Sequence, residues 1–240
     1  MRPKVLIIVP AFNEAGSIAA VVEDLHRVCS DYDVLVVDDG STDQTAQRVP
    51  VGTSVVRLPF NLGIGGAMQT GYRYAAMHDY DIAVQLDADG QHPPDQVPLL
   101  IEKMRTSGAN LVVGSRFLAE QGYSPPPSRL AGISVLRGLL RLLTGQPITD
   151  PTSGLRAADR RVIHAFAYWY PEDYPEPEVI LLLHRAGLRI TEVAVVMADR
   201  TAGSTSIPFA RGVFYLVKVS AALLLDLIRN PWPQERVTPP

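Results

Sequence analysis

Two aspartates, Asp87 and Asp89, stand one residue apart directly after the apolar segment 81–86. In an extended chain, residues i and i+2 point to the same side, so we expect the two carboxylates to converge where a strand ends. A hard divalent cation relieves their mutual repulsion, and Mg²⁺ is typically bound by one or two carboxylates together with substrate phosphates. The pair therefore predicts a Mg²⁺ or Mn²⁺ site, with Gln91 as a neutral third ligand. An Asx-type turn closed by Gly90 is the alternative interpretation.

A second acidic pair, Asp38 and Asp39, ends the apolar segment 33–38. A carboxylate at this position can accept hydrogen bonds from a ribose hydroxyl or a base N–H. The alternative is simple capping of a following helix, for which Ser41 and Thr42 are both suitable residues. Since capping needs only one of them, it leaves the two aspartates unexplained.

These acidic pairs belong to a regular pattern of predicted elements. Strands are expected at residues 4–9, 33–38, 54–58, 81–86 and 110–114. Helices are expected between most of them, at residues 16–30, 42–48, 64–78 and 94–107. The alternation is typical of βαβ units, hence of an α/β fold with a Rossmann-like, mostly parallel sheet flanked by helices. Such sheets bind ligands at the carboxyl ends of their strands. Polar or glycine-rich residues follow all five strands, so we expect a ligand cleft at that edge.

The second half of the chain is less regular. After the proline-rich stretch 122–128, the elements expected are helices at 128–144 and 176–186, a strand at 188–197, and an amphipathic helix at 207–230. A proline-rich tail follows at 231–240. We therefore expect one domain over residues 1–206, followed by a C-terminal helix and a tail.

The composition narrows the class of protein. The chain has 240 residues, of which 47% are apolar, and this is enough for one domain with a sizeable core. A net charge of −3 gives no reason to expect a nucleic-acid partner. The single cysteine, Cys29, excludes an intramolecular disulfide and is typical of a reducing compartment. Because no uncharged apolar stretch of about 18 residues occurs, we expect no membrane-spanning helix and a cytoplasmic location.

Six motifs, taken together and in this order, resemble those of the family 2 glycosyltransferases of GT-A fold. They read VPAFNE, VVDDGSTDQT, NLGIGGAMQTG, QLDADGQHPPD, VGSRF and DPTSGLRA. The most similar branch is that of the dolichyl- and polyprenyl-phosphate sugar synthases, and the resemblance covers residues 4–206. It implies an inverting transferase that uses a UDP- or GDP-linked sugar and Mg²⁺ or Mn²⁺. The acceptor implied for the hexose is a polyprenyl phosphate or a cell-envelope glycan or glycolipid precursor.

The resemblance also implies roles for the residues that match the motifs. Those implied to bind the donor are Pro10, Ala11, Phe12, Glu14, Asp39, Gly63, Gly65, Asp87, Ala88 and Asp89. Gly63 and Gly65 would let the donor approach the backbone, because glycine has no Cβ; a turn before the helix is the alternative. Asp87, Asp89 and Gln91 are implied to hold the metal ion.

Further residues are implied to act on the reacting groups or on the acceptor. Arg116 would face a phosphate, and Asp150, then Glu178, are the candidate bases if the acceptor is a hydroxyl. The residues implied to bind the acceptor are Ser134, Arg137, Ser153, Arg156 and Arg200. Solvated arginines on an amphipathic helix are an equally good interpretation of the segment around Arg137. The loop after Arg200 departs from the family pattern, because Ile207 stands where a basic residue is usual.

Several alternatives stay open. Lys218 lies in the middle of the C-terminal helix and argues against a membrane span. That helix is then expected to lie in the membrane surface, bind a membrane-protein partner, form a homodimer, or pack on its own domain. A non-catalytic nucleotide-binding scaffold is the rival function from another class. A sugar-1-phosphate nucleotidyltransferase is disfavoured, since the first strand is not followed by a basic, glycine-rich loop.

Overall fold

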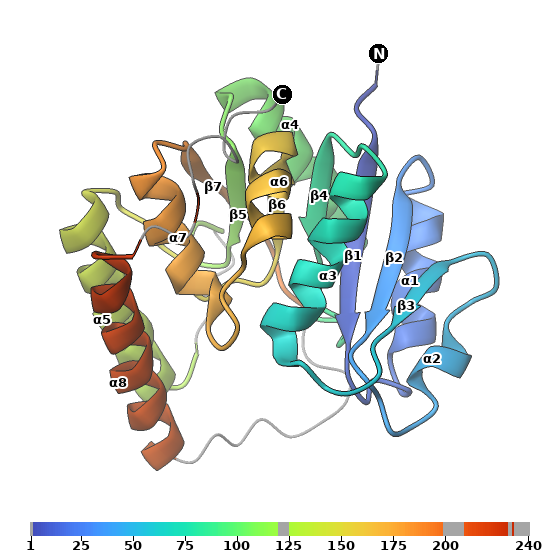
Figure 1. Cartoon of the computed structure of the whole chain (residues 1–240), viewed down its shortest axis with the longest axis horizontal. Helices are drawn as coiled ribbons and strands as arrows, with labels where there is room; N and C mark the ends of the chain where they lie inside the picture. Colours follow the sequence, from blue (N-terminus) through green and yellow to red (C-terminus); the bar gives the residue numbers. More distant parts are fainter. Residues whose placement is uncertain (1, 120–124, 199–208, 230–231, 233–240) are drawn as a thin grey trace.

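The structure is a computed structural model that describes residues 2–119, 125–198, 209–229 and 232. The described residues form one seven-stranded sheet in the order β3-β2-β1-β4-β6-β5-β7 (Figure 1). The strands are β1 (Val5–Ala11), β2 (Asp33–Asp38), β3 (Ser54–Arg57), β4 (Ile82–Gln85), β5 (Leu111–Ser115), β6 (Arg156–Asp159) and β7 (Ile190–Ala194). All neighbouring strands are parallel except β6, which runs antiparallel to both β4 and β5. The α/β class and the mostly parallel sheet are therefore confirmed.

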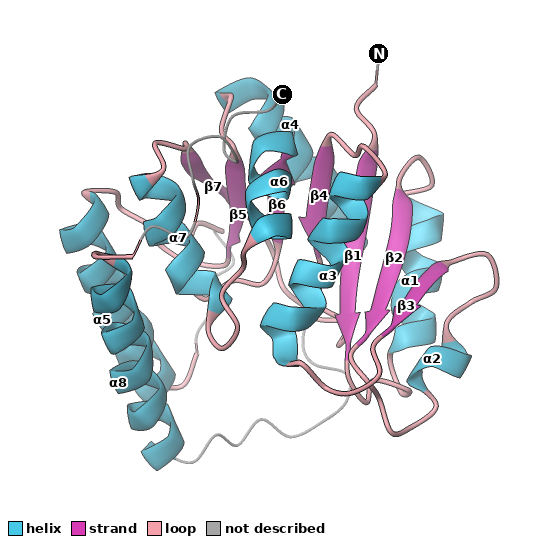
Figure 2. Ribbon diagram, viewed as in Figure 1, coloured by secondary structure: helices cyan, strands magenta, loops and turns pink. Residues whose placement is uncertain are grey.

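Helices cover both faces of the sheet (Figure 2). They are α1 (Ile18–Val28), α2 (Thr45–Arg48), α3 (Gly63–Met77), α4 (Val97–Ser107), α5 (Pro127–Thr144), α6 (Arg160–Tyr168), α7 (Pro175–Arg185) and α8 (Phe209–Asp226), with a short 3₁₀ turn at Pro94–Gln96. Helices α3, α6 and α7 pack on one face, and α1 and α4 pack on the other.

The central strand β1 shows why the sheet forms. All seven of its residues are buried, as expected for a parallel strand covered on both faces. Successive side chains alternate between the two faces, so Leu6 and Ile8 join the core under α3 and α6, whereas Ile7 and Val9 join the core under α1 and α4. Each fully buried aliphatic side chain contributes about 1.5–3 kcal/mol of transfer free energy.

A third apolar cluster lies at one side of the sheet, where α5, α7 and α8 pack together (Figure 1). Leu136 and Leu140 of α5 contact this cluster together with Val219 and Leu223 of α8. The C-terminal helix thus packs on its own chain, while the proline-rich tail predicted after it lies outside the described residues except for Trp232. No helix in the described part of the chain is long and apolar enough to cross a membrane.

Strand β6 and helix α6 are absent from the sequence prediction. The segment Arg156–Asp159 reads RAAD, and it lacks the β-branched and aromatic residues that mark a strand. Its pairing is imposed by the neighbours β4 and β5. For α6 a signal exists, because the Asp159 carboxylate caps the helix by accepting the backbone N–H of Val162 at 2.9 Å. Strand β6 matters for function, since its first residue, Arg156, pairs with Gln85 at the carboxyl end of β4.

Candidate active site

The predicted site lies at the edge where β1, β2 and β4 end and β6 begins. Asp87 follows the last residue of β4 by two positions, and its side chain is 38% exposed. Gly154, just before β6, packs directly against it: a Cβ added to Gly154 would lie 2.6 Å from Asp87 Oδ2. A glycine is therefore required beside this carboxylate, and the carboxylate remains accessible from the edge of the sheet.

Asp89 forms the turn that the alternative interpretation expected. Its Oδ1 accepts the backbone N–H of Gln91 at 3.0 Å, which is an Asx-type bond. A carboxylate offers about four acceptor positions, so this bond is compatible with metal ligation by the same group. The Gln91 carbonyl accepts the backbone N–H of Ala198 at 2.9 Å, which fixes the Gln91 backbone. Ligation of a metal by the Gln91 side chain stays a prediction.

The donor set suits a hard cation that shares its ligands with a substrate. The described residues contain no group of three or more His, Cys, Asp or Glu side chains arranged to hold a metal ion. Two carboxylates without a complete protein cage are what Mg²⁺ or Mn²⁺ requires when phosphate oxygens supply the remaining ligands. The buried His92 fixes the loop, because its Nδ1 accepts the backbone N–H of Asp87 at 3.4 Å. Asp87 and Asp89 therefore fit the implied metal.

One functional candidate, Glu176, was not selected from the sequence. It lies in the first turn of α7, and burial raises the pKa of its carboxyl group. Arg156 lowers that pKa and the negative charge of Asp87 raises it, so Glu176 is within electrostatic reach of the predicted metal site. Asp87 likewise contributes to the raised pKa of Tyr170, whose main cause is burial.

The sequence analysis favoured Glu178 in this region, and the geometry does not support that role. Residues two apart on a helix differ by about 200° in direction, so Glu176 and Glu178 point to opposite sides of α7. Glu178 is buried and shares a hydrogen bond with the Asp226 carboxyl group of α8. Burial, then Asp226 and Asp173, raise the pKa of Glu178 to about 7. Its partners therefore belong to the interface between α7 and α8.

The expected roles of Asp150 and Arg116 also require correction. Asp150 has no exposed surface, and its Oδ2 and Oδ1 accept hydrogen bonds from Arg116 Nε at 2.6 Å and Nη2 at 2.7 Å. Both groups are buried in a two-point ion pair, and Arg116 also donates to Thr152 Oγ1 at 2.9 Å. A carboxylate held in this way is a poor proton acceptor, and the guanidinium faces a carboxylate where a phosphate was expected.

Arg156 and Ser153 are structural in a similar sense. The Arg156 side chain is buried and donates to three backbone carbonyls, those of Ser153, Pro151 and Glu176, at 2.8, 3.2 and 2.8 Å. These bonds hold the loop before β6 against the start of α7. Ser153 is also buried. The acceptor contacts expected for both residues are therefore replaced by contacts that shape the site.

The predicted donor loops after β1 and β2 are joined to each other by hydrogen bonds. The backbone N–H of Asn13 donates to Ser41 Oγ at 3.0 Å, and that of Glu14 donates to Thr45 Oγ1 at 2.8 Å. Pro10 and Ala11 are the last, buried residues of β1, while Phe12 is 43% exposed at the edge. Ala88, between the two aspartates, is buried in the core below α1 and α4.

Asp39 and the two glycines connect the second loop to α3. Asp39 is buried and its Oδ1 accepts the backbone N–H of Leu62 at 2.7 Å; burial raises its pKa, and this bond opposes the rise. Gly63 has φ +80°, a conformation that favours glycine, as the turn alternative expected. A Cβ on Gly65 would overlap the backbone of Pro171 and Glu172. Chain packing alone thus explains both glycines, and donor contacts by all three residues stay predictions.

Two of the three remaining acceptor residues lie on α5, and no contact of either with Asp87 or Asp89 is seen among the described residues. Arg137 of α5 donates through Nε to the Thr149 carbonyl, and its guanidinium lies 3.9 Å from the centre of the Phe117 ring. Ser134 is exposed and donates to the Leu130 carbonyl at 2.8 Å within its own helix. Arg200 lies outside the described residues.

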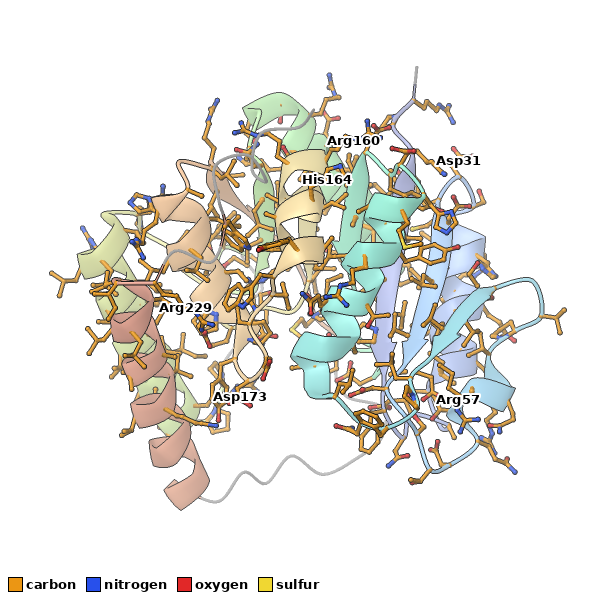
Figure 3. All side chains as sticks on the ribbon, viewed as in Figure 1. Asp31, Arg57, Arg160, His164, Asp173 and Arg229 are labelled. Carbon is orange, nitrogen blue, oxygen red and sulfur yellow. The ribbon has the colours of Figure 1, made fainter. Side chains whose placement is uncertain are left out.

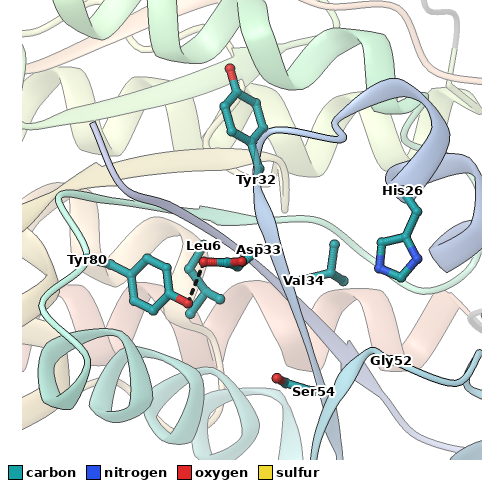
Figure 4. Close-up of a pocket in the computed structure, with 8 residues that line it drawn as sticks. All are labelled: Leu6, His26, Tyr32, Asp33, Val34, Gly52, Ser54 and Tyr80. Atoms are coloured by element: carbon teal, nitrogen blue, oxygen red, sulfur yellow. Dashed lines mark hydrogen bonds between the residues drawn. The ribbon is translucent and has the colours of Figure 1, made fainter. Parts of the chain in front are cut away.

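A cavity of about 180 Å³ lies at the opposite end of the strands (Figure 4). It is lined by Leu6, His26, Tyr32, Asp33, Val34, Gly52, Ser54 and Tyr80. The Tyr80 hydroxyl donates to Asp33 Oδ2 at 2.9 Å. Because Leu6 and Asp33 belong to the amino-terminal halves of β1 and β2, this cavity is separate from the aspartates at the carboxyl edge.

Comparison with known proteins agrees with this geometry. Residues 6–166 match the family described as Glycosyl transferase family 2. An undecaprenyl-phosphate mannosyltransferase from Micrococcus luteus is 33% identical over 217 residues, which are 84% of this chain and 86% of that protein. A polyprenol monophosphomannose synthase from Mycolicibacterium smegmatis is 30% identical over 216 residues, covering 85% and 81% of the two chains.

Solved structures show the same fold. The glucosyl-3-phosphoglycerate synthase of Mycobacterium tuberculosis, in complex with Mn²⁺, UDP-glucose and phosphoglyceric acid, superposes with a TM-score of 0.72 at 26% identity. The match covers 93% of this chain and 79% of that one. Mannosyl-3-phosphoglycerate synthase from Rubrobacter xylanophilus, at 19% identity and a TM-score of 0.71 over 94% and 75% of the chains, shares the fold. The chain therefore belongs to glycosyltransferase family 2 and is a glycosyltransferase of GT-A fold, in the branch of the polyprenyl-phosphate sugar transferases.

Proposed function

We propose that the protein is an inverting, metal-dependent glycosyltransferase that moves a hexose from a UDP- or GDP-linked sugar to a polyprenyl phosphate. The observation that carries the proposal is the Asp87 carboxylate, which stays 38% exposed at the carboxyl edge and rests against Gly154. The names of two relatives, an undecaprenyl-phosphate mannosyltransferase and a polyprenol monophosphomannose synthase, support the acceptor. The Mn²⁺ and UDP-glucose in a neighbouring structure support the metal and the kind of donor.

In the reaction, an acceptor phosphate oxygen forms a bond to the anomeric carbon as the bond from that carbon to the nucleoside diphosphate breaks. Attack from the face opposite the leaving group inverts the configuration. Asp87 and Asp89 would hold the cation, which, when bound, offsets the negative charge that develops on the diphosphate. The chain's own contribution is to fix both carboxylates through His92, Gly154 and the Asx turn.

A phosphate acceptor also agrees with the pairing of Asp150. A hydroxyl acceptor must lose a proton to a base as it attacks, whereas a phosphate oxygen is already anionic. Asp150 is bound to Arg116 through both oxygens and is unsuited to accept a proton. Glu176 lies on the site side of α7, and we assign it to orienting bound substrate next to Asp87.

A membrane-bound acceptor requires a surface that meets the membrane, and we assign this role to the outer face of α5 and α8. Exposed apolar or small residues recur there at helical spacing. They are Ala131, Val135, Gly138 and Leu142 of α5, and Val217, Ala221 and Leu224 of α8. Arg129 and Arg141 of α5 are exposed and positive, whereas the ammonium group of Lys218 on α8 is paired with Asp173. Apolar residues flanked by cations suit an anionic lipid surface, whereas a second copy would bring like charges together.

Co-sedimentation with vesicles tests this surface. We expect the protein to bind phosphatidylglycerol vesicles more strongly than phosphatidylcholine vesicles. The double variant Leu142→Glu, Leu224→Glu should lose this binding, whereas Met77→Glu, at an exposed apolar residue on α3, should keep it. Unchanged vesicle binding by the double variant, or a homodimer that this variant disrupts, would contradict the assignment.

The proposed reaction is tested by incubating the protein with UDP- and GDP-linked hexoses, Mn²⁺ and a polyprenyl phosphate. We expect one donor to give a polyprenyl-phosphate sugar, and we expect EDTA to stop the reaction. If donors bind but neither transfer nor slow hydrolysis occurs with any polyprenyl phosphate, a non-catalytic nucleotide-binding role is the better account.

A further inference from the structure

The loop between α6 and α7, residues 169–174, connects two parts of the molecule that are far apart in sequence. On one side it meets the start of α3. The Gly65 N–H donates to the Glu172 carbonyl at 3.2 Å, and Gly65 has no room for a Cβ against this backbone. Just before the loop, Gln69 Nε2 of α3 donates to the Tyr168 carbonyl at 3.2 Å. We call residues 169–174 the bridge loop.

On its other side the bridge loop meets α8 and the residues after it. Lys218 Nζ lies 2.7 Å from Asp173 Oδ2, and the same ammonium group lies 5.4 Å from the centre of the Tyr174 ring. The Arg229 guanidinium lies 4.9 Å from the centre of the Trp169 ring. Figure 3 places both Asp173 and Arg229 on the side of the molecule that carries α8.

Apolar packing between the bridge loop and α8 comes from Tyr174, which packs against the cluster that contains Val219 and Leu223. Beside this contact, a cavity of about 260 Å³ separates the loop from the helix. It is lined by Trp169, Pro171, Glu172, Asp173, Tyr174, Glu178, Lys218, Ala222 and Arg229. The ion pair and the two cation–π contacts therefore act together with the packing of Tyr174 to determine where the loop lies relative to α8.

The middle of the bridge loop contacts an element next to the candidate active site. Pro171 and Glu172 hold the start of α3, which follows the predicted donor loop. Tyr170, and Glu176 directly after the loop, are within electrostatic reach of Asp87. A displacement of the loop from α8 would therefore change the position of the backbone at Gly65 and of the groups around Asp87.

We propose that the bridge loop couples α8 to the donor site, and that Lys218 and Arg229 are positioning residues for donor binding. They act through Asp173, Tyr174 and Trp169, and they do not touch the donor. The proposal rests on the proposed function in one respect only, namely that the donor is a nucleotide-diphosphate sugar bound near α3 and Asp87.

The first test measures donor affinity. Calorimetric titration with UDP- and GDP-linked hexoses in Mn²⁺ identifies the donor of the wild-type protein. The double variant Lys218→Ala, Arg229→Ala should bind this donor about fivefold more weakly, the size expected for losing an ion pair and cation–π contacts. The control is Leu225→Ala, because Leu225 lies on α8 two turns after Lys218 but is exposed. It should bind the donor as the wild type does.

The second test needs no ligand. The Gly65 N–H belongs to the first turn of α3, where helix amides lack partners within the helix, and Glu172 is its acceptor. Its hydrogen exchange, followed by NMR, should accelerate severalfold in the double variant, while amides of the buried strand β1 keep their rates. Asp173→Ala should accelerate exchange of the Gly65 N–H less than the double variant does. The single variant Lys218→Arg can keep the ion pair with Asp173, so its Gly65 N–H should exchange at the wild-type rate.

The outcomes separate the two proposals. If the wild type binds no nucleotide-sugar, the proposed function fails, and Gly65 exchange still tests the coupling. If the wild type binds a donor and the double variant matches it in both affinity and Gly65 exchange, the coupling is wrong. If the double variant does not fold, Asp173→Ala and Lys218→Arg decide the matter by the same two measurements.

Discussion

Asp87 and Asp150 lie at the same edge of the sheet, yet the two carboxylates differ in exposure and in their charged partners. Asp150 has no exposed surface and is held through both oxygens by Arg116. The Asp87 side chain is 38% exposed, and His92 Nδ1, which lies 3.7 Å from its Oδ2, already accepts the Asp87 backbone N–H. A carboxylate with a permanent internal counter-charge belongs to the fold, whereas a carboxylate left accessible at a strand end is suited to a cationic ligand.

The most direct test of this difference is to neutralise the accessible aspartates. Asp87→Asn or Asp89→Asn should lower transfer activity by at least about 100-fold, because loss of charge stabilisation at the leaving group costs several kcal/mol. Thermal unfolding should change little, since both side chains are only partly buried. Transfer assays and thermal scans on the same preparations check this. Activity within a few-fold of the wild type would contradict it.

The same substitution at the buried aspartate should give the reverse pattern. Asp150→Asn leaves Arg116 buried without its counter-charge, and breaking a buried pair costs about 3–5 kcal/mol of unfolding free energy. Urea unfolding measures this loss. Replacing both partners with apolar residues, as in Asp150→Leu, Arg116→Met, should recover part of it. A stable but inactive Asp150→Asn protein would instead return Asp150 to a catalytic role.

A third prediction concerns a carboxyl pair that is neutralised by a proton instead of a cation. The folded state raises the Glu178 pKa from 4.5 to about 7, so the folded protein holds this proton more tightly than the unfolded chain does. Protonated Glu178 therefore contributes up to about 3 kcal/mol to the free energy of unfolding. This contribution is fully present below pH 4.5 and is lost as the pH rises through about 7. Glu178→Gln should flatten the loss of stability between pH 5 and pH 8 in urea unfolding, with activity retained. An unchanged pH profile would show that Glu178 does not titrate in this range.

The smallest expected effect comes from the glycine behind Asp87. A Cβ in Gly154→Ala would lie 2.6 Å from Asp87 Oδ2 and must displace that carboxylate. We expect Mn²⁺ affinity to fall about tenfold, the lower end of the range for changes to groups that orient metal ligands. Gly138→Ala, at an exposed glycine with open space around it, is the matched control. Equal Mn²⁺ affinity in both variants would indicate that Gly154 does not position Asp87.

The sequence was sufficient for the parts of the fold that local patterns determine. The strand predicted at residues 33–38 is β2 to the residue, and the helix predicted at 64–78 is α3 with both ends displaced by one residue. Strand β6 was missed because RAAD becomes a strand only through its neighbours β4 and β5. In that sense, tertiary pairing overrode a weak local preference.

The sequence selected the acids of the candidate site but not their partners. Asp87 and Asp89 were selected because i and i+2 converge in an extended chain, whereas the structure places Ala88 and Asp89 in a turn, and their metal binding stays a prediction. Nothing in the spacing shows that Asp150 meets Arg116, 34 residues away in sequence. The choice between Glu176 and Glu178 depends on which side of α7 faces the sheet edge, and that is determined by packing against α8.

The central claim is that Asp87 and Asp89 hold a divalent ion that in turn binds the donor diphosphate. Calorimetric titration of UDP and GDP into the wild type and the Asp89→Asn variant, in Mn²⁺ and in EDTA, tests it most directly. We predict that one nucleotide binds the wild type at least about tenfold more tightly in Mn²⁺ than in EDTA, and that this difference disappears in the variant. Equal affinity of the wild type in Mn²⁺ and EDTA, or a Mn²⁺ dependence that survives in Asp89→Asn, would contradict the claim.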